Sequence, residues 1–172
     1  LREHPPQPAA SARDLRSLLW SSIDNDTSRD LDQIEYVESR PDGGARVLIG
    51  IADVDASVPK ESPIDQHALR ETATVYTGVE NFSMIPEELS TGSTSLLESQ
   101  ERGAMVVEFT VDAQAQIAAN DIYPARVVNR AQLAYPSIGA WLAGQAPARS
   151  EDRRVGREGR YRWSPYHEKT PT

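Results

Sequence analysis

The sequence predicts an α+β fold built on a mixed, mainly antiparallel sheet with flanking helices. In one predicted hairpin, the alternating segment 33–39 leads through the turn "RPDGG" into an apolar run at 45–54. A second antiparallel pair, 103–112 and 115–128, surrounds a polar turn. Helical signals flank these pairs, and 172 residues suffice for one domain with a core.

The N-terminal region predicts a linker followed by a short helix. Residues 1–10 contain three prolines, which is typical of a linker. In "SARDLRSLLW" (11–20), Ser11 can cap a helix whose apolar side chains fall at helical spacing: Leu15, Leu18 and Leu19. A loop over the acidic stretch follows.

Two further helices are expected. Segment 62–76 has Ser62 as N-cap, Pro63 in the first turn and Asp65 where it favours the helix dipole. Segment 82–97 reads as a loop with a short turn at "PEEL". Segment 135–144 starts a helix with three apolar side chains on one face: Ile138, Trp141 and Leu142.

Composition excludes several classes of protein. The chain has no Cys, which excludes a disulfide framework and thiolate zinc sites. No apolar run is long enough to span a membrane, so no membrane partner is expected. The net charge of −8 and the pI of about 4.9 argue, taken alone, against a nucleic-acid-binding surface.

The most unusual stretch is "SSIDNDTSRDLDQIEYVES" (21–39), which holds Asp24, Asp26, Asp30 and Asp32. So much like charge is costly unless water or a cation relieves it. One reading is a helix–loop–helix calcium site, since acidic or hydroxyl side chains fill its ligand positions up to Glu35. Arg29 stands where that loop needs Gly, and the following residues predict a strand rather than a helix.

A catalytic magnesium site is the second reading, because hard divalent cations prefer carboxylate oxygens. Asp24, Asp30 and Asp32 can converge if the loop folds back on itself. The alternative is an acidic surface loop in which Asp26 or Asp30 caps a turn. The residues alone leave the magnesium site and the surface loop open.

"SIDNDTSRDLDQ" resembles the signature of the ribonuclease II / ribonuclease R (RNB) family of 3′-to-5′ exoribonucleases, an Ile-Asp followed after a spacer by Asp-Leu-Asp-Asp. Further blocks are similar to the family's motifs in the same order: "GIADVDASVPKESPIDQHALRETATVY", "SMIPEELSTGSTSLLESQERGAMVVEFTVD" and "ARVVNRAQLAYPSIGAWL". The resemblance covers about residues 18 to 143.

The resemblance implies roles for individual residues. Asp24, Asp30 and Asp32 match three of the family's four active-site aspartates, which hold Mg²⁺, and the Asp32 position is especially important for cleavage. The fourth position is Gln33, whose carbonyl can coordinate Mg²⁺ but which removes one negative charge. Lower metal affinity is expected, and a catalytically degenerate RNA-binding relative is the alternative function.

Three more positions match the family. Tyr76 matches a residue that contacts the RNA 3′ end, and Tyr135 an aromatic that stacks near the terminal base. An ordinary half-buried core tyrosine is the alternative for each. Asp53 also matches a family position, where the alternatives are support of the site from the adjacent strand and a structural hydrogen-bonding role.

The expected organisation follows from the resemblance. Residues 1–17 are a linker or the end of a preceding domain, and 18–148 are the N-terminal part of an RNB catalytic domain. Residues 149–172 resemble the translation of a sequencing adapter and are expected to be a non-native tail, with a natural basic disordered tail as the alternative. The resemblance implies a cytoplasmic, Mg²⁺-dependent enzyme acting on single-stranded RNA. Its basic RNA-binding domains and the C-terminal half of its catalytic domain would lie outside this chain, which alone is expected to be inactive.

Overall fold

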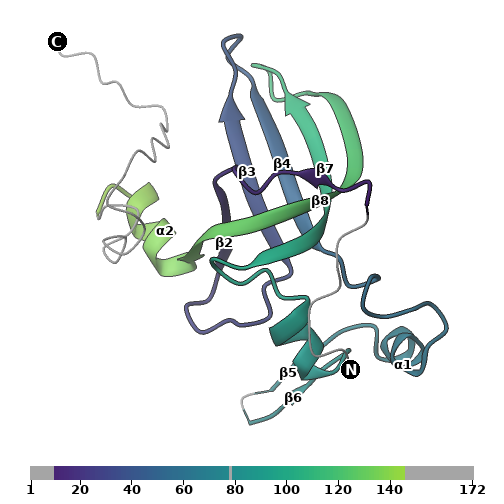
Figure 1. Ribbon diagram of the computed structural model, residues 1–172. Helices are drawn as coiled ribbons and strands as arrows, with labels where there is room; N and C mark the ends of the chain where they lie inside the picture. The colour runs from purple at the N-terminus through teal and green to yellow at the C-terminus, as the bar shows by residue number, and fades with distance from the viewer. Residues whose placement is uncertain (1–9, 78, 146–172) are drawn as a thin grey trace.

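The computed structural model describes residues 10–77 and 79–145, and the mixed sheet that they form confirms the predicted fold class (Figure 1). The strands are β1 Arg13–Asp14, β2 Trp20–Asp24, β3 Gln33–Ser39, β4 Ala45–Ala52, β5 Val75–Tyr76, β6 Asn81–Phe82, β7 Glu101–Val111 and β8 Ile117–Ala134. The helices are α1 Pro63–Glu71, α2 Tyr135–Leu142 and the π-helical turn η1 Leu89–Ser93. Residues 1–9 of the expected linker and the tail expected over 149–172 lie outside the described residues.

Five strands close into a barrel. The order is β8-β2-β3-β4-β7, and β7 pairs again with β8, so the sheet returns to its first strand. The pairings are antiparallel except for β2 with β8, which is parallel. The 18-residue β8 serves both sides of the closure, with its first part along β7 and its second part along β2. Closure leaves none of these five strands as a free sheet edge.

The interior of the barrel is a single apolar cluster. Trp20, Ile34 and Leu48 are fully buried members contributed by the strands, and Leu31 and Leu96 close the cluster from the loops. Alternation along β3 sends Ile34 inward while Gln33 and Val37 stay exposed, as the sequence pattern predicts. The core therefore fixes which face each residue of β3 presents.

The helix predicted for residues 11–20 is wrong. Arg13 and Asp14 instead form β1, which runs parallel to β8, and the Leu15 N–H donates to the Arg126 carbonyl at 2.9 Å. The Trp20 indole N–H donates to the Leu15 carbonyl at 2.9 Å, which ties the segment to the core. Pairing with a strand more than a hundred residues away outweighs a local helical spacing.

The start of the helix at Pro63 is confirmed, but α1 ends early. The Ser62 hydroxyl accepts the Asp65 N–H at 3.2 Å, as expected of an N-cap. Thr72 adopts a left-handed conformation with φ of 60°, which ends the helix at Glu71. Val75 and the residues after it then form the small β5–β6 hairpin instead of continuing the helix.

The loop predicted for 82–97 contains η1, and α2 begins at Tyr135 as expected. Ile138 and Trp141 are half-buried and Leu142 is 71% exposed, so α2 contributes no buried residue. No helix in the described ranges has the length and apolarity needed to cross a membrane.

Candidate functional site

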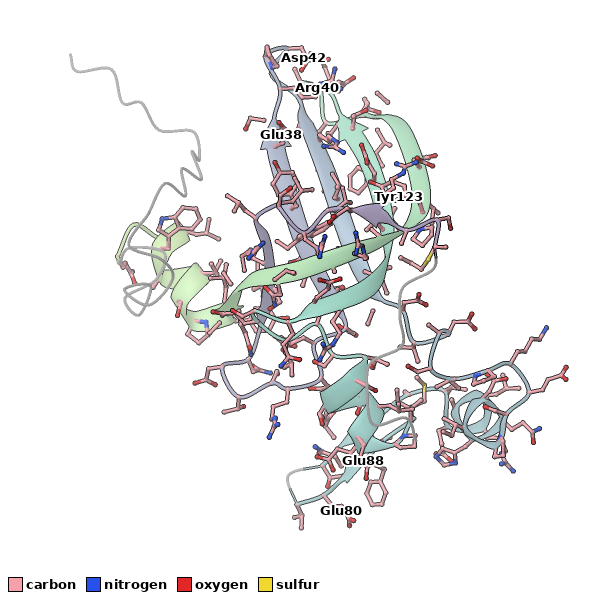
Figure 2. The ribbon with its side chains drawn as sticks, in the orientation of Figure 1. Glu38, Arg40, Asp42, Glu80, Glu88 and Tyr123 are labelled. Atoms are coloured by element: carbon pink, nitrogen blue, oxygen red, sulfur yellow. The ribbon has the colours of Figure 1, made fainter. Side chains whose placement is uncertain are left out.

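The acidic stretch lies at the end of the barrel opposite the β3–β4 turn (Figure 1). Asp24 ends β2, Gln33 starts β3, and the connecting loop carries Asp30 and Asp32. A strand on each side rules out the helix–loop–helix calcium site, because Glu35 lies within β3 and not in an exiting helix. In Figure 2, Glu38, Arg40 and Asp42 mark the end of the barrel at the β3–β4 turn, at the top of the view. Glu80 and Glu88 lie at the bottom of the view, on the side of the opposite end.

The backbone of the acidic loop is bonded to the barrel on both sides. The Ala52 N–H, at the end of β4, donates to the Asp32 carbonyl at 2.9 Å. The Gln132 amide, on β8, donates to the Ser28 carbonyl at 3.0 Å. The buried Leu31 side chain anchors the loop between these two points. The loop is therefore fixed by the fold, although it has no regular secondary structure.

Tyr76 brings three predicted site residues into one neighbourhood. Tyr76 lies in β5 of the β5–β6 hairpin. Its hydroxyl donates a hydrogen bond to the Asp30 carboxylate. That bond, partial burial and the negative charges of Asp30, Asp32 and Asp24 raise the pKa of Tyr76 to about 12. The charges of all three carboxylates thus act on the Tyr76 hydroxyl, while Tyr76 remains 64% exposed.

Tyr135 lies beside the end of β2. The β2–β8 register pairs Asp24 with Ala134, so Tyr135 is the next residue along β8 into α2, and it is 56% exposed. Both tyrosines that the sequence singled out are therefore surface residues beside the acidic loop, rather than buried core residues. An exposed ring next to such a loop is available to stack on a base.

The Asp53 carboxylate makes a local contact, and the Asp53 backbone is bonded to β7. Its carboxylate accepts the Ala56 N–H at 3.4 Å, and its backbone N–H donates to the Gly103 carbonyl at 3.3 Å. These bonds place Asp53 in the turn that follows β4. Asp24 likewise accepts a local bond, from the Asn25 N–H at 2.7 Å.

The donor chemistry suits a hard divalent cation, but the side-chain positions do not form a finished site. Within 10–77 and 79–145, no three His, Cys, Asp or Glu side chains gather closely enough to hold one ion. Asp24, Asp30 and Asp32 all lie near Tyr76, but their carboxylates are not close enough to coordinate one ion together. In this arrangement, Asp30 is engaged by Tyr76 instead.

Two more residues near the loop were not predicted as site residues: Glu35 had a place only in the calcium reading, and Ser95 had none. Glu35, on the same face of β3 as Gln33, has a buried Oε2 that bonds to no described residue, and burial raises the pKa of its carboxyl. Ser95 is buried and bonds directly to the acidic loop. Its position in "STGSTSLL", among other small polar residues, gave no signal, because the contact spans more than sixty residues.

A family model and curated relatives both match most of this chain. A model of the RNB domain matches residues 12–167. The chain is 34% identical over 152 residues to ribonuclease R of Escherichia coli, covering 88% of this chain and 19% of that protein. It therefore spans about a fifth of the length of the curated relatives it matches.

Solved structures share the fold. Mycoplasma genitalium RNase R in complex with double-stranded RNA superposes with a TM-score of 0.75 at 33% identity, covering 80% of this chain and 24% of that one. Yeast Ssd1, described as a pseudonuclease, superposes with a TM-score of 0.67 at 15% identity, covering 84% of this chain and 18% of that one. The second match shows the fold alone, so the fold does not by itself decide whether a chain cleaves RNA.

Proposed function

Because the chain belongs to the RNB-domain family, we propose that the protein carrying it is a 3′-to-5′ exoribonuclease that hydrolyses single-stranded RNA in the cytoplasm to nucleoside 5′-monophosphates. One observation supports this most directly: Tyr76, exposed and bonded to Asp30, lies within electrostatic reach of Asp24 and Asp32. An exposed aromatic ring and a group of carboxylates thus adjoin each other at one end of the barrel.

Each group has a proposed task. Tyr76 and Tyr135 stack their exposed rings on the last bases of the RNA. Stacking tolerates any sequence, because every base has a flat face. Asp32, Asp30 and Asp24 are the proposed catalytic carboxylates. The acidity of this chain agrees with the proposal because basic RNA-binding surfaces are expected in other parts of the protein.

Mg²⁺ is the proposed cofactor, with Asp24, Asp30, Asp32 and Gln33 as its ligands. Since no three acidic side chains surround one point in the described structure, these ligands have to shift to share an ion. Asp30 is the clearest case, because one of its oxygens accepts the Tyr76 hydroxyl.

The test is the product of the reaction. The intact protein, incubated with single-stranded RNA and Mg²⁺, is expected to release nucleoside 5′-monophosphates, identified by chromatography and mass. Release of internal oligonucleotides, or of nucleoside 3′-monophosphates, would contradict the proposal. Addition of EDTA is the control and is expected to stop the release.

A second candidate is a degenerate relative that binds RNA without cleaving it. Gln33 favours it, since a neutral amide stands where the family has a fourth aspartate. That candidate predicts RNA binding by the intact protein with no mononucleotide released under the same conditions.

A further inference from the structure

Ser95 holds the two peptide groups that flank Asp30. It is 1% exposed and lies two residues beyond the end of η1. Its hydroxyl accepts the Leu31 N–H at 3.0 Å and donates to the Arg29 carbonyl at 2.7 Å. A hydroxyl can do both at once, because it carries one donor hydrogen and two acceptor lone pairs. One buried atom thus fixes the backbone immediately before and immediately after Asp30.

A third bond completes the attachment. The Leu96 N–H donates to the Leu31 carbonyl at 2.8 Å, so Ser95 and Leu96 together hold Leu31 by both of its backbone polar groups. The Leu31 and Leu96 side chains are both 1% exposed and belong to the barrel core. The acidic loop is therefore pinned to segment 95–96 by packing as well as by hydrogen bonds.

The segment that holds the loop is itself held. The Asn129 amide, on β8, donates to the Leu96 carbonyl at 2.9 Å and to the Ser22 hydroxyl at 3.0 Å. The Arg102 guanidinium, on β7, donates to the Ser95 carbonyl at 3.1 Å. Bonds to two barrel strands leave Ser95 little freedom to move.

We propose that Ser95 is a positioning residue for Asp30. Its hydroxyl sets where the Asp30 carboxylate stands relative to Tyr76 and Asp32, although it touches neither RNA nor the carboxylate. The proposal rests on the proposed function, in which Asp30 is a catalytic carboxylate. Loss of the hydroxyl leaves a buried N–H and carbonyl in need of new partners, and the loop shifts to supply them.

The experiment compares Ser95→Ala with Thr94→Val in the intact protein. Thr94 is the matched control, since it is also buried, at 6% exposed, but its hydroxyl donates to the Leu89 carbonyl in η1 and not to the acidic loop. Ser95→Ala is expected to lower kcat for RNA cleavage on the order of 10- to 100-fold, the cost of a small misplacement of a catalytic group. KM for RNA is expected to stay within about twofold, because the stacking tyrosines remain in place. Thr94→Val is expected to leave both constants unchanged.

Hydrogen–deuterium exchange of the same proteins separates this inference from the proposed function. Faster exchange at Leu31 in Ser95→Ala, with no change there in Thr94→Val, supports the positioning role. Unchanged kcat and unchanged protection of Leu31 in Ser95→Ala would overturn it. If the wild type cleaves no RNA, the proposed function fails, and protection at Leu31 still decides whether Ser95 fixes the loop.

Ser95→Cys is a second variant that tests the inference if Ser95→Ala does not fold. The thiol fills a similar space and hydrogen-bonds weakly, so its kcat is expected to fall between those of wild type and Ser95→Ala. Wild-type kcat and wild-type protection of Leu31 in a folded Ser95→Cys protein would count against the inference.

Discussion

Asp30 is held from two sides, with its backbone fixed by Ser95 and its carboxylate engaged by Tyr76. Asp32 is more exposed, and the bond from the Ala52 N–H reaches only its carbonyl. Neighbouring carboxylates in one short loop therefore have different environments. The residue types were evident in the sequence, but this difference depends on contacts with three distant segments.

The Tyr76 ring and the Tyr76 hydroxyl are expected to have separable effects. Tyr76→Ala should weaken binding of single-stranded RNA by about 5- to 150-fold, since stacking contributes about 1–3 kcal/mol per base. Tyr76→Phe keeps the ring, loses only the bond to Asp30 and should bind RNA as the wild type does. Fluorescence anisotropy in an Asp32→Asn background measures affinity with cleavage suppressed. Equal affinities for Tyr76→Ala and wild type would show that this ring does not contact RNA.

At the scale of elements, the strands with clear alternation were predictable and the long-range pairings were not. The bounds of β3 follow from its own sequence, because one face enters the core. The segment around Leu15 and Leu18 has helical spacing, yet both side chains pack against the barrel core while Arg13 and Asp14 pair with β8. Local pattern carries no information about such a partner.

The β3–β4 turn depends on Gly44. A Cβ at this position would stand 2.3 Å from the Val111 carbonyl oxygen, a backbone atom of the neighbouring β7. Gly44→Ala is therefore expected to lower the free energy of unfolding by about 1–3 kcal/mol, measured by urea denaturation.

Gly92→Ala is the matched control for the turn, because a Cβ at Gly92 would meet no atom within 4 Å. Its effect on the free energy of unfolding should stay within about 0.5 kcal/mol. A Gly44→Ala protein as stable as Gly92→Ala would mean that β7 does not approach the turn so closely.

At the scale of the whole molecule, barrel closure brings the ends of β2, β3, β4 and β8 together at the acidic loop. The aspartate cluster and the family it resembles could be recognised from the sequence. Closure through the two-sided β8 could not, because a strand that changes partners along its length has the same alternating pattern as one that does not. The tyrosines could be singled out, but not their exposure beside the loop.

An ion-pair network on the barrel wall predicts how stability depends on pH. Arg46 donates to both oxygens of Glu108, at 2.7 and 3.0 Å, and the Tyr123 hydroxyl donates to the same carboxylate. Figure 2 places Tyr123 near the point where β1 crosses the barrel. The bond to Arg46 lowers the pKa of Glu108 below its ordinary value of 4.5.

The sign of the effect follows from that lowered pKa. The stabilisation by Glu108 is complete above about pH 4.5 and is lost as the pH falls through the lower folded-state pKa. Glu108→Gln should therefore cost about 1 kcal/mol at pH 7 and progressively less in acid, as measured by urea denaturation at several pH values. A constant difference between the two proteins down to pH 2 would contradict this account.

Cleavage of RNA from its 3′ end by the acidic loop, as proposed here, is tested most directly by following the shortening of a 5′-labelled single-stranded RNA. The intact protein is incubated with this RNA and Mg²⁺ beside its Asp32→Asn and Gln33→Asp variants. Stepwise shortening from the 3′ end by the wild type, abolished in Asp32→Asn, is the predicted result and makes Gln33 a tolerated ligand. No shortening by the wild type, with cleavage appearing in Gln33→Asp, would contradict the claim and show that the chain kept the fold and lost the chemistry.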